Sequence, residues 1–415
     1  MSLDRFYNKS PVFAQNIACS VYGYLERRKR FSAEFYRLLG ELKNSDYFDR
    51  DQIQSYSNAK LAKSLNCALE KSEYYQNIVG AHGSALDFLI NLDQFPILTK
   101  EDVRSNKDQI KCAGDLKVIP FKTSGTSGKA LKFYKDNFAI ASQWAIWFRH
   151  RSRFGIDLND LHVNFTGKPV VPQFQTMPPY WRFNRASNQF LVPMQVVTQD
   201  KIKSIVDFLN TIRPKYYSGY PSILAEVARL SLSNGFELKS SSKPEYIFPG
   251  AEPLLETQRS YLMQWTGATI SEQYGMTEGV CNISKCEHDN FHEDFEFGFI
   301  EKMNKIVLDD GAVRAQVVAT GFSNNVFPFI RYDTGDTAIW EPDSYRCTCG
   351  RSSPVVRSIE GRTEDYIITP EGNRIMRLDY IFKDSSEIKE AQVVQDSLGS
   401  IKICLLYTSP SPRDS

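Results

Sequence analysis

A chain of 415 residues is longer than one small hydrophobic core requires, and this length favours two or three domains. Hydrophobic residues make up 42% of the sequence, which is typical of a globular protein in water. Lysine and arginine number 50 against 49 aspartate and glutamate residues, so the net charge of +1 supplies no positive field to recruit a phosphate backbone. This balance argues against a dedicated nucleic-acid binder and favours small or local partners.

The N-terminus shows no targeting signal. Residues 1–31 lack the short basic start, apolar core and small-residue cleavage site of a signal peptide. No run of about 18 apolar residues occurs, so no transmembrane segment is expected and we predict a cytoplasmic protein. The basic run ERRKR follows an amphipathic stretch and could touch an anionic membrane, but a solvated helix end is the favoured interpretation.

The order of predicted elements indicates an α/β protein. Residues 1–115 are rich in helix formers with apolar residues three and four apart, which predicts a helical N-terminal region. Near its end, Pro96 and then Thr99 followed by Glu101 and Asp102 are typical of a loop that enters a capped helix. From Val118 onward, short β-branched and aromatic runs alternate with helical stretches such as KSIVDFLNTIR and PSILAEVARLSLSNG, which predicts sheets covered by helices.

The last twelve residues, 404–415, differ from the rest. Their sequence CLLYTSPSPRDS has no periodicity and interrupts the strand pattern GSIKI. It also matches the translation of a common sequencing adapter, so we expect this segment to be an artefact and the natural product to continue past Ile403. A natural disordered tail is the alternative.

A loop rich in glycine and hydroxyl residues is the first candidate site. It supplies the three things that a phosphate-binding loop needs, namely flexible backbone N–H donors, side-chain hydroxyls and a cation. Its residues are Thr123, Ser124, Gly125, Thr126, Ser127, Gly128 and Lys129. Two residues separate the glycines and Ala130 follows the lysine, so the loop is not a Walker A motif, and alone it could equally be a linker.

Four further motifs follow in order. They are Phe248-Pro-Gly-Ala-Glu-Pro253, Ser271-Glu-Gln-Tyr-Gly-Met-Thr-Glu278, Arg331-Tyr-Asp-Thr-Gly-Asp336 and Gly361-Arg-Thr-Glu-Asp365. Each could separately be a turn or a hairpin. In this order and at these separations they resemble the motifs of the adenylate-forming superfamily, and within it the phenylacetate-CoA ligase group with its CapK-type branch. The resemblance covers residues 5–403.

The resemblance implies an architecture and a role for each motif. It implies a core domain over 116–361 and, over 362–403, the start of a small α+β lid domain whose catalytic lysine we do not find before residue 403. The glycine-rich loop, Lys129 included, would wrap the outer phosphates of ATP, and Arg362 would assist at the ribose. The remaining implied contacts are Gly250, Ala251, Glu252 and Pro253 against adenine, Tyr274 stacked on the base with Gly275 and Met276 beside it, Thr277 on the α-phosphate, Glu278 on Mg²⁺ and Asp336 on the ribose.

Cysteine and histidine residues in the second half suggest a metal site. Cys286, His292, Cys347 and Cys349 form the ligand set of a closed structural zinc centre, with His288 and Cys281 as reserve ligands. The spacing alone leaves free thiols in surface loops equally open. Some phenylacetate-CoA ligase relatives carry a similar arrangement, and this resemblance favours zinc.

The function implied by the resemblance is activation of a small carboxylic acid. A carboxylate would attack the α-phosphorus of ATP, and the acyl group would then pass to a thiol, with CoA as the default acceptor. Two alternatives stay open: transfer to a carrier protein or to an amino sugar in capsular polysaccharide biosynthesis, and a nucleotide-binding scaffold without catalysis. A ligase should consume CoA, whereas a scaffold should bind ATP without pyrophosphate exchange.

Overall fold

The computed structural model describes residues 3–79, 92, 95–114, 117–123, 130–361, 367–370, 374–375 and 388–407. Helices dominate the first part of the chain, as its apolar spacing predicts. They are α1 (Leu3–Lys9), α2 (Val12–Arg30), α3 (Ala33–Ser45), α4 (Arg50–Lys71), α5 (Glu73–Val79), α7 (Lys100–Ser105) and α8 (Lys107–Ile110).

Helix α7 illustrates how local sequence sets an element's start. The Thr99 hydroxyl accepts a hydrogen bond from the Asp102 backbone N–H, and the Asp102 carboxylate accepts from the Thr99 backbone N–H. This reciprocal pair satisfies two N–H groups that the first helical turn would leave free. The predicted helix start at Thr99 is therefore confirmed.

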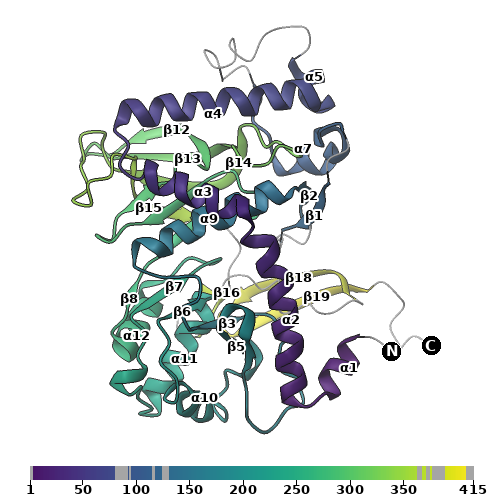
Figure 1. Cartoon of the computed structure of the whole chain (residues 1–415), viewed down its shortest axis with the longest axis vertical. Helices are drawn as coiled ribbons and strands as arrows, with labels where there is room; N and C mark the ends of the chain where they lie inside the picture. The colour runs from purple at the N-terminus through teal and green to yellow at the C-terminus, as the bar shows by residue number, and fades with distance from the viewer. Residues whose placement is uncertain are drawn as a thin grey trace.

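A six-stranded sheet forms the lower half of the molecule in Figure 1, with strand order β4-β5-β3-β6-β7-β8. Strands β5, β3, β6, β7 and β8 run parallel to one another, and the edge strand β4 is antiparallel to β5. The strands are β3 (His162–Thr166), β4 (Arg182–Asn184), β5 (Gln189–Pro193), β6 (Tyr216–Gly219), β7 (Tyr246–Pro249) and β8 (Thr269–Ile270). Three helices pack on this sheet: α10 (Ile202–Leu209), α11 (Pro221–Ser233) and α12 (Glu256–Thr266). Continuous apolar runs such as YIFP form buried parallel strands because helices cover the sheet.

A seven-stranded antiparallel sheet forms the upper half, with strand order β12-β13-β14-β15-β11-β10-β9. Its strands are β9 (Gln273–Gly275), β10 (Asn282–Lys285), β11 (Phe291–Glu293), β12 (Gly298–Val307), β13 (Val313–Gly321), β14 (Tyr332–Trp340) and β15 (Val355–Gly361). Helix α4 lies across β12 and β13, and its Leu61, Leu65 and Ala68 enter the same core as Val317 and Trp340.

Two elements connect the halves. Helix α9 (Asn137–Arg153) follows the hairpin of β1 (Ile119–Lys122) and β2 (Lys132–Lys135) and packs on α3. Helix α2 contacts α9 and also β4 of the six-stranded sheet, and in Figure 1 it runs along the side of the molecule between the halves. The arrangement confirms the predicted α/β class, in which helices cover sheets.

The C-terminal part contains two pairs of antiparallel strands. Strands β16 (Ile367–Ile368) and β17 (Arg374–Ile375) pair, and β18 (Ile388–Ser397) pairs with β19 (Ser400–Tyr407). The expected interruption of the strand pattern at Cys404 is wrong, because Cys404 pairs with Gln392 and the strand continues to Tyr407. Among the described residues, no helix is both long enough and apolar enough to span a bilayer.

Candidate nucleotide and metal sites

Tyr274 and Asp336 meet directly, although they lie 62 positions apart in the chain. The Tyr274 hydroxyl donates to Asp336 Oδ2 at 2.6 Å. Burial raises the pKa of the Tyr274 phenol well above its ordinary value, and the carboxylate of Asp336 adds to this, so the phenol stays a proton donor at neutral pH. Asp336 itself is 6% exposed.

This contact shows that the seven-stranded sheet is strongly curved. Tyr274 belongs to β9 and Asp336 to β14, and β15, β11 and β10 lie between these strands in the sheet order. A flat sheet would hold β9 and β14 roughly 19 Å apart. The sheet therefore coils until its β9 edge approaches β14, which brings two of the predicted motifs together.

Glu278 is buried beside β14, the strand that carries Asp336. It is 3% exposed, and its Oε1 accepts a hydrogen bond of 3.1 Å from the Tyr332 hydroxyl at the start of β14. Thr277 and Gly275 are exposed, and Met276 is half-buried. A Cβ added to Gly275 would lie 2.7 Å from Asn282 Oδ1, so the backbone passes too close to that amide for a side chain at this position.

Lys135 is a charged residue of this region that the motifs did not reveal. Its ammonium is buried at the end of β2, and the Gln143 Oε1 atom accepts from it at 3.4 Å. Burial lowers the pKa of Lys135 to about 8, and the nearby charge of Glu278 opposes this shift. The signal in the sequence is weak: Lys135 lies two residues after Phe133 in the strand KFYK, and so shares the buried face of that strand.

The glycine-rich loop is anchored at its base. The Thr123 N–H donates to the Leu131 carbonyl at 2.9 Å, and the Leu131 N–H donates to Thr123 Oγ1 at 3.0 Å. These bonds close the β1–β2 hairpin on either side of the loop. Ser124, Gly125, Thr126, Ser127, Gly128 and Lys129 lie outside the described residues, as does Arg362.

The segment 250–253 leaves the carboxyl end of β7 in the six-stranded sheet. The Gly250 N–H donates to the Gly219 carbonyl at 3.0 Å, and Ala251 has a φ of 68°. A Cβ added to Gly250 would meet no protein atom within 4 Å, so one face of this backbone is open. Glu252 Oε2 accepts from the Ser222 N–H at 3.2 Å, at the start of α11, and Pro253 follows it. The ends of parallel strands are where α/β folds commonly bind ligands.

The four predicted metal ligands come together. The ligand atoms of Cys286, His292, Cys347 and Cys349 all lie within 4.8 Å of one another. The Sγ atoms of Cys286 and Cys347 are 3.8 Å apart, close to the roughly 3.8 Å that tetrahedral Zn–S bonds of 2.3 Å require. Cys349 Sγ lies 3.4 Å from His292 Nε2.

The surroundings of His292 direct its Nε2 atom toward the thiols. Nδ1 lies 3.3 Å from the Ser353 carbonyl oxygen, and a proton on Nδ1 that bonds this oxygen leaves the lone pair on Nε2. Burial lowers the pKa of His292 to about 4, so the ring is neutral at pH 7. Of the two reserve ligands, the structure places His288 at the surface and Cys281 in the hydrophobic core, and neither belongs to the four-residue group.

The cysteines differ in their tendency to ionise. Burial raises the pKa of Cys286, and it raises that of Cys347 to about 12. For Cys349 burial also acts upward, but hydrogen bonds from the Arg351 backbone and from Cys347 outweigh it, and the pKa falls below its ordinary value. Buried neutral thiols lose their protons when a divalent metal binds, so the group fits a closed zinc centre.

Comparison with known proteins finds relatives of low sequence identity. No family model matches it. It is 24% identical to Protein CapK of Staphylococcus aureus over 422 aligned positions, which cover 100% of this chain and 90% of the relative. It is 25% identical to the phenylacetate-coenzyme A ligase of Pseudomonas putida, over 77% of this chain and 72% of the relative.

Solved structures of 2-hydroxyisobutyryl-CoA ligase have the same fold. A complex of that enzyme with 2-HIB-AMP and CoA superposes with a TM-score of 0.61 at 18% identity, covering 88% of this chain and 80% of the other. An open conformation gives a TM-score of 0.58 at 16% identity and covers 90% and 88% of the two chains. At these identities the likeness establishes the fold alone.

Proposed function

Because the chain is a homologue of CapK and of phenylacetate-CoA ligases and has the fold of adenylate-forming ligases, we propose that it activates a carboxylic acid with ATP and transfers the acyl group to CoA. A carboxylate oxygen bonds the α-phosphorus as the bond to the β-phosphate bridge breaks, which releases pyrophosphate. The thiol sulfur then bonds the acyl carbon, the bond to AMP breaks, and the thiol proton is released.

The observation that carries this proposal is the meeting of Tyr274 with Asp336 beside the Glu278 segment. In the proposed site the Asp336 carboxylate accepts hydrogen bonds from the ribose hydroxyls, and the Tyr274 ring lies on the adenine. The exposed Thr277 hydroxyl donates to the α-phosphate. Glu278 would hold Mg²⁺, which offsets phosphate charge when bound.

The remaining roles complete the nucleotide site. We assign the open backbone of Gly250, Ala251, Glu252 and Pro253 to the adenine wall, with Gly275 and Met276 at the base. Residues Thr123 to Lys129 would hold the outer phosphates, and Arg362 the ribose. Since no protein nucleophile takes part in this chemistry, positioning and charge neutralisation lower the barrier.

Pyrophosphate exchange tests the first step. Labelled pyrophosphate should enter ATP only when a suitable carboxylate is present, and the nucleotide product with CoA should be AMP. Asp336→Ala should reduce the exchange at least tenfold, because a charge-assisted hydrogen bond to the ribose is lost. ATP binding without exchange for any carboxylate in a broad panel would favour the scaffold. Exchange with a carboxylate but no consumption of CoA would favour a carrier protein or an amino sugar as acceptor.

We also propose that Cys286, His292, Cys347 and Cys349 bind one structural zinc ion. The support is their mutual distance and the orientation of His292. Metal analysis of the purified protein should find about one zinc per chain. Cys347→Ser should lose that metal and lower the melting temperature, whereas His288→Gln, a change at the exposed neighbouring histidine, should retain it. A full zinc content in Cys347→Ser would refute the assignment.

A further inference from the structure

The outer face of helix α2 is apolar, whereas a helix on the surface of a protein in water usually turns its polar face outward. Five apolar side chains that lie three or four residues apart along this face are each more than half exposed: Phe13, Ile17, Val21, Tyr24 and Leu25. The opposite face is buried against the protein and contains Gln15, Cys19 and Gly23. Single exposed apolar residues are common, but a continuous row of them marks a binding surface.

A groove beside this face enlarges the apolar surface. It has a volume of about 520 Å³ and lies between α2 and residues 183–186, which include the end of β4. Ile17, Val21 and Tyr24 of α2 line it together with Phe183. Arg185 is the one lining residue that carries a charge at neutral pH. The groove therefore combines a mostly apolar lining with a single, positive charge.

Positive charges predominate around this surface. Residues 6–30 contain five cations and one carboxylate, a net charge of +4, whereas the whole chain carries +1. The carboxylate is Glu26, and the cations are Lys9, Arg27, Arg28, Lys29 and Arg30. Two further cations approach from outside this segment, because Lys168 lies 5.2 Å from the centre of the Tyr22 ring and Arg185 lines the groove.

The single carboxylate Glu26 does not compensate this charge. It pairs with Lys29 and Arg30. Arg27 donates only to neutral oxygens, those of Ala186 and Asn159, and Arg28 lies 5.9 Å from the centre of the ring of Tyr24 in the apolar row. In the described part of the chain, neither of these two arginines lies within ion-pair distance of a carboxylate. An excess of positive charge therefore remains beside the apolar row.

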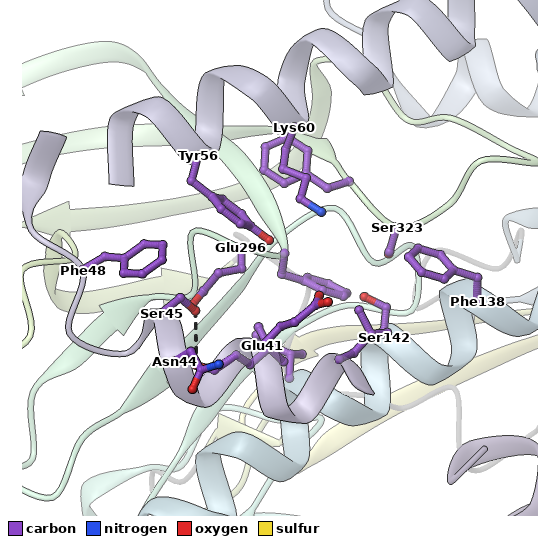
Figure 2. Close-up of a pocket in the computed structure, with 15 residues that line it drawn as sticks. Glu41, Asn44, Ser45, Phe48, Tyr56, Lys60, Phe138, Ser142, Glu296 and Ser323 are labelled. Atoms are coloured by element: carbon purple, nitrogen blue, oxygen red, sulfur yellow. Dashed lines mark hydrogen bonds between the residues drawn. The ribbon is translucent and has the colours of Figure 1, made fainter. Parts of the chain in front are cut away.

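The pocket between α3, α4 and α9 shows no such excess (Figure 2). Its two carboxylates, Glu41 and Glu296, pair with Arg37 and Arg149, and Lys60 is the one cation among the lining residues. Of these two hollows, the groove beside α2 is the one in which an apolar lining meets unbalanced positive charge.

From these observations we infer that the outer face of α2 binds reversibly to the surface of an anionic lipid membrane. Its apolar side chains enter the boundary between headgroups and acyl chains, and the lysine and arginine side chains contact the negative headgroups. A second copy of this chain fits less well, because two α2 faces in contact would bring like charges together. The sequence alone favours a solvated helix end for the run ERRKR, but the structure places this run at the end of an exposed apolar row.

Sedimentation of the full chain with lipid vesicles tests the inference. The protein should bind vesicles of equal parts phosphatidylcholine and phosphatidylserine at least tenfold more tightly than vesicles of phosphatidylcholine alone. Arg28→Gln combined with Lys29→Gln should weaken binding to the anionic vesicles at least tenfold, because each basic residue near such a surface contributes about fivefold. The matched control, Lys239→Gln combined with Lys243→Gln, changes two exposed lysines between α11 and β7 and should alter the affinity less than twofold.

A second variant tests the apolar row. Ile17→Gln combined with Val21→Gln keeps every charge and should weaken binding at least tenfold. Both positions are exposed, so the melting temperature should stay that of the wild type and shows that the variant is folded.

Several outcomes would overturn the inference. They are equal affinity for neutral and anionic vesicles, undiminished binding by either α2 variant, an equal loss in the Lys239 and Lys243 control, and no binding at roughly 1 mM lipid. A dimer in light scattering that Ile17→Gln with Val21→Gln separates into monomers would also overturn it, because a second copy would then cover the face. Since the assay contains neither ATP nor CoA, its result does not depend on whether the chain is a ligase.

Discussion

The hydrogen bond from Tyr274 to Asp336 is one contact of the candidate site whose loss can be measured without a substrate. Tyr274→Phe removes the donor and leaves the buried Asp336 carboxylate with one hydrogen bond fewer. The free energy of unfolding in urea should fall by about 1–3 kcal/mol. Tyr345→Phe removes an exposed hydroxyl that donates to Asn290 and should cost less than about 0.5 kcal/mol. Equal losses in the two variants would mean that the Tyr274 bond does not stabilise the fold.

His162 should make the stability depend on pH. Burial lowers its pKa from 6.5 to about 4, and the ring lies against Tyr216 and within 2.9 Å of Gln189 Nε2. Between these pH values the unfolded chain binds a proton that the folded chain excludes, so stability is lost as the pH falls from 6.5 to 4. The lost stability amounts to at most about 3 kcal/mol.

Comparison with a variant that lacks His162 isolates this contribution. His162→Gln cannot titrate, so its urea stability should fall less steeply than that of wild type between pH 6.5 and 4. His288→Gln changes an exposed histidine and should leave the wild-type slope intact. An unchanged slope in His162→Gln would contradict the role of burial.

Strand β6 depends on the glycine at its end. Gly219 has a φ of 144°, and a Cβ at this position would lie 2.1 Å from the Phe165 carbonyl oxygen of the neighbouring strand β3. Gly219→Ala must therefore distort the backbone and push the two strands apart. Gly235 also has a positive φ, of 68°, but a Cβ there would meet nothing within 4 Å.

The two alanine variants separate steric overlap from backbone strain. Gly235→Ala should destabilise the protein by about 1–2 kcal/mol, the cost of the left-handed conformation alone. Gly219→Ala should cost at least about 3 kcal/mol or prevent folding, because the overlap is with backbone that cannot move alone. Thermal and urea unfolding would measure both, and similar losses would refute the steric argument.

At the scale of secondary-structure elements, local sequence predicts the helices α10 and α11. The stretches KSIVDFLNTIR and PSILAEVARLSLSNG become α10 and α11, because their apolar residues repeat with helical spacing. The continuation of β19 to Tyr407 could not be read in the same way, since its strand pairing with β18 is decided across a hairpin.

The candidate site was only partly predictable for a similar reason. The motifs identify Tyr274, Asp336 and the four metal ligands as residue types with suitable chemistry. The meeting of Tyr274 with Asp336 depends on the coiling of a seven-stranded sheet, which no local pattern encodes.

At the scale of the whole molecule, Arg149 joins the helical region to the seven-stranded part. From α9 its guanidinium donates to Asp294 at 2.6 Å, to Glu296 at 2.5 Å and to the Leu42 carbonyl at the end of α3 at 3.2 Å. Arg149→Met would leave two buried carboxylates without this partner, and the free energy of unfolding should fall by about 3–5 kcal/mol.

An exposed ion pair provides the matched control. Arg229→Met breaks a surface contact with Glu226 within α11, and it should cost less than about 1 kcal/mol. Urea unfolding of both variants at one pH makes the comparison. A loss in Arg149→Met as small as that in Arg229→Met would show that the buried network does not hold the regions together.

Helices α4 and α5 form hydrogen bonds with residues that follow them by more than 250 positions in the chain. The Tyr75 hydroxyl donates to the Pro328 carbonyl at 2.9 Å, and Arg50 donates to the Asp343 carbonyl at 2.5 Å. During synthesis at 5–20 residues per second, α4 must wait roughly 10–60 s after it leaves the ribosome before these strands exist. Over that time the apolar side chains of Leu61 and Leu65 have no sheet to cover them, so this helix is the segment that a ribosome-associated chaperone would be expected to hold.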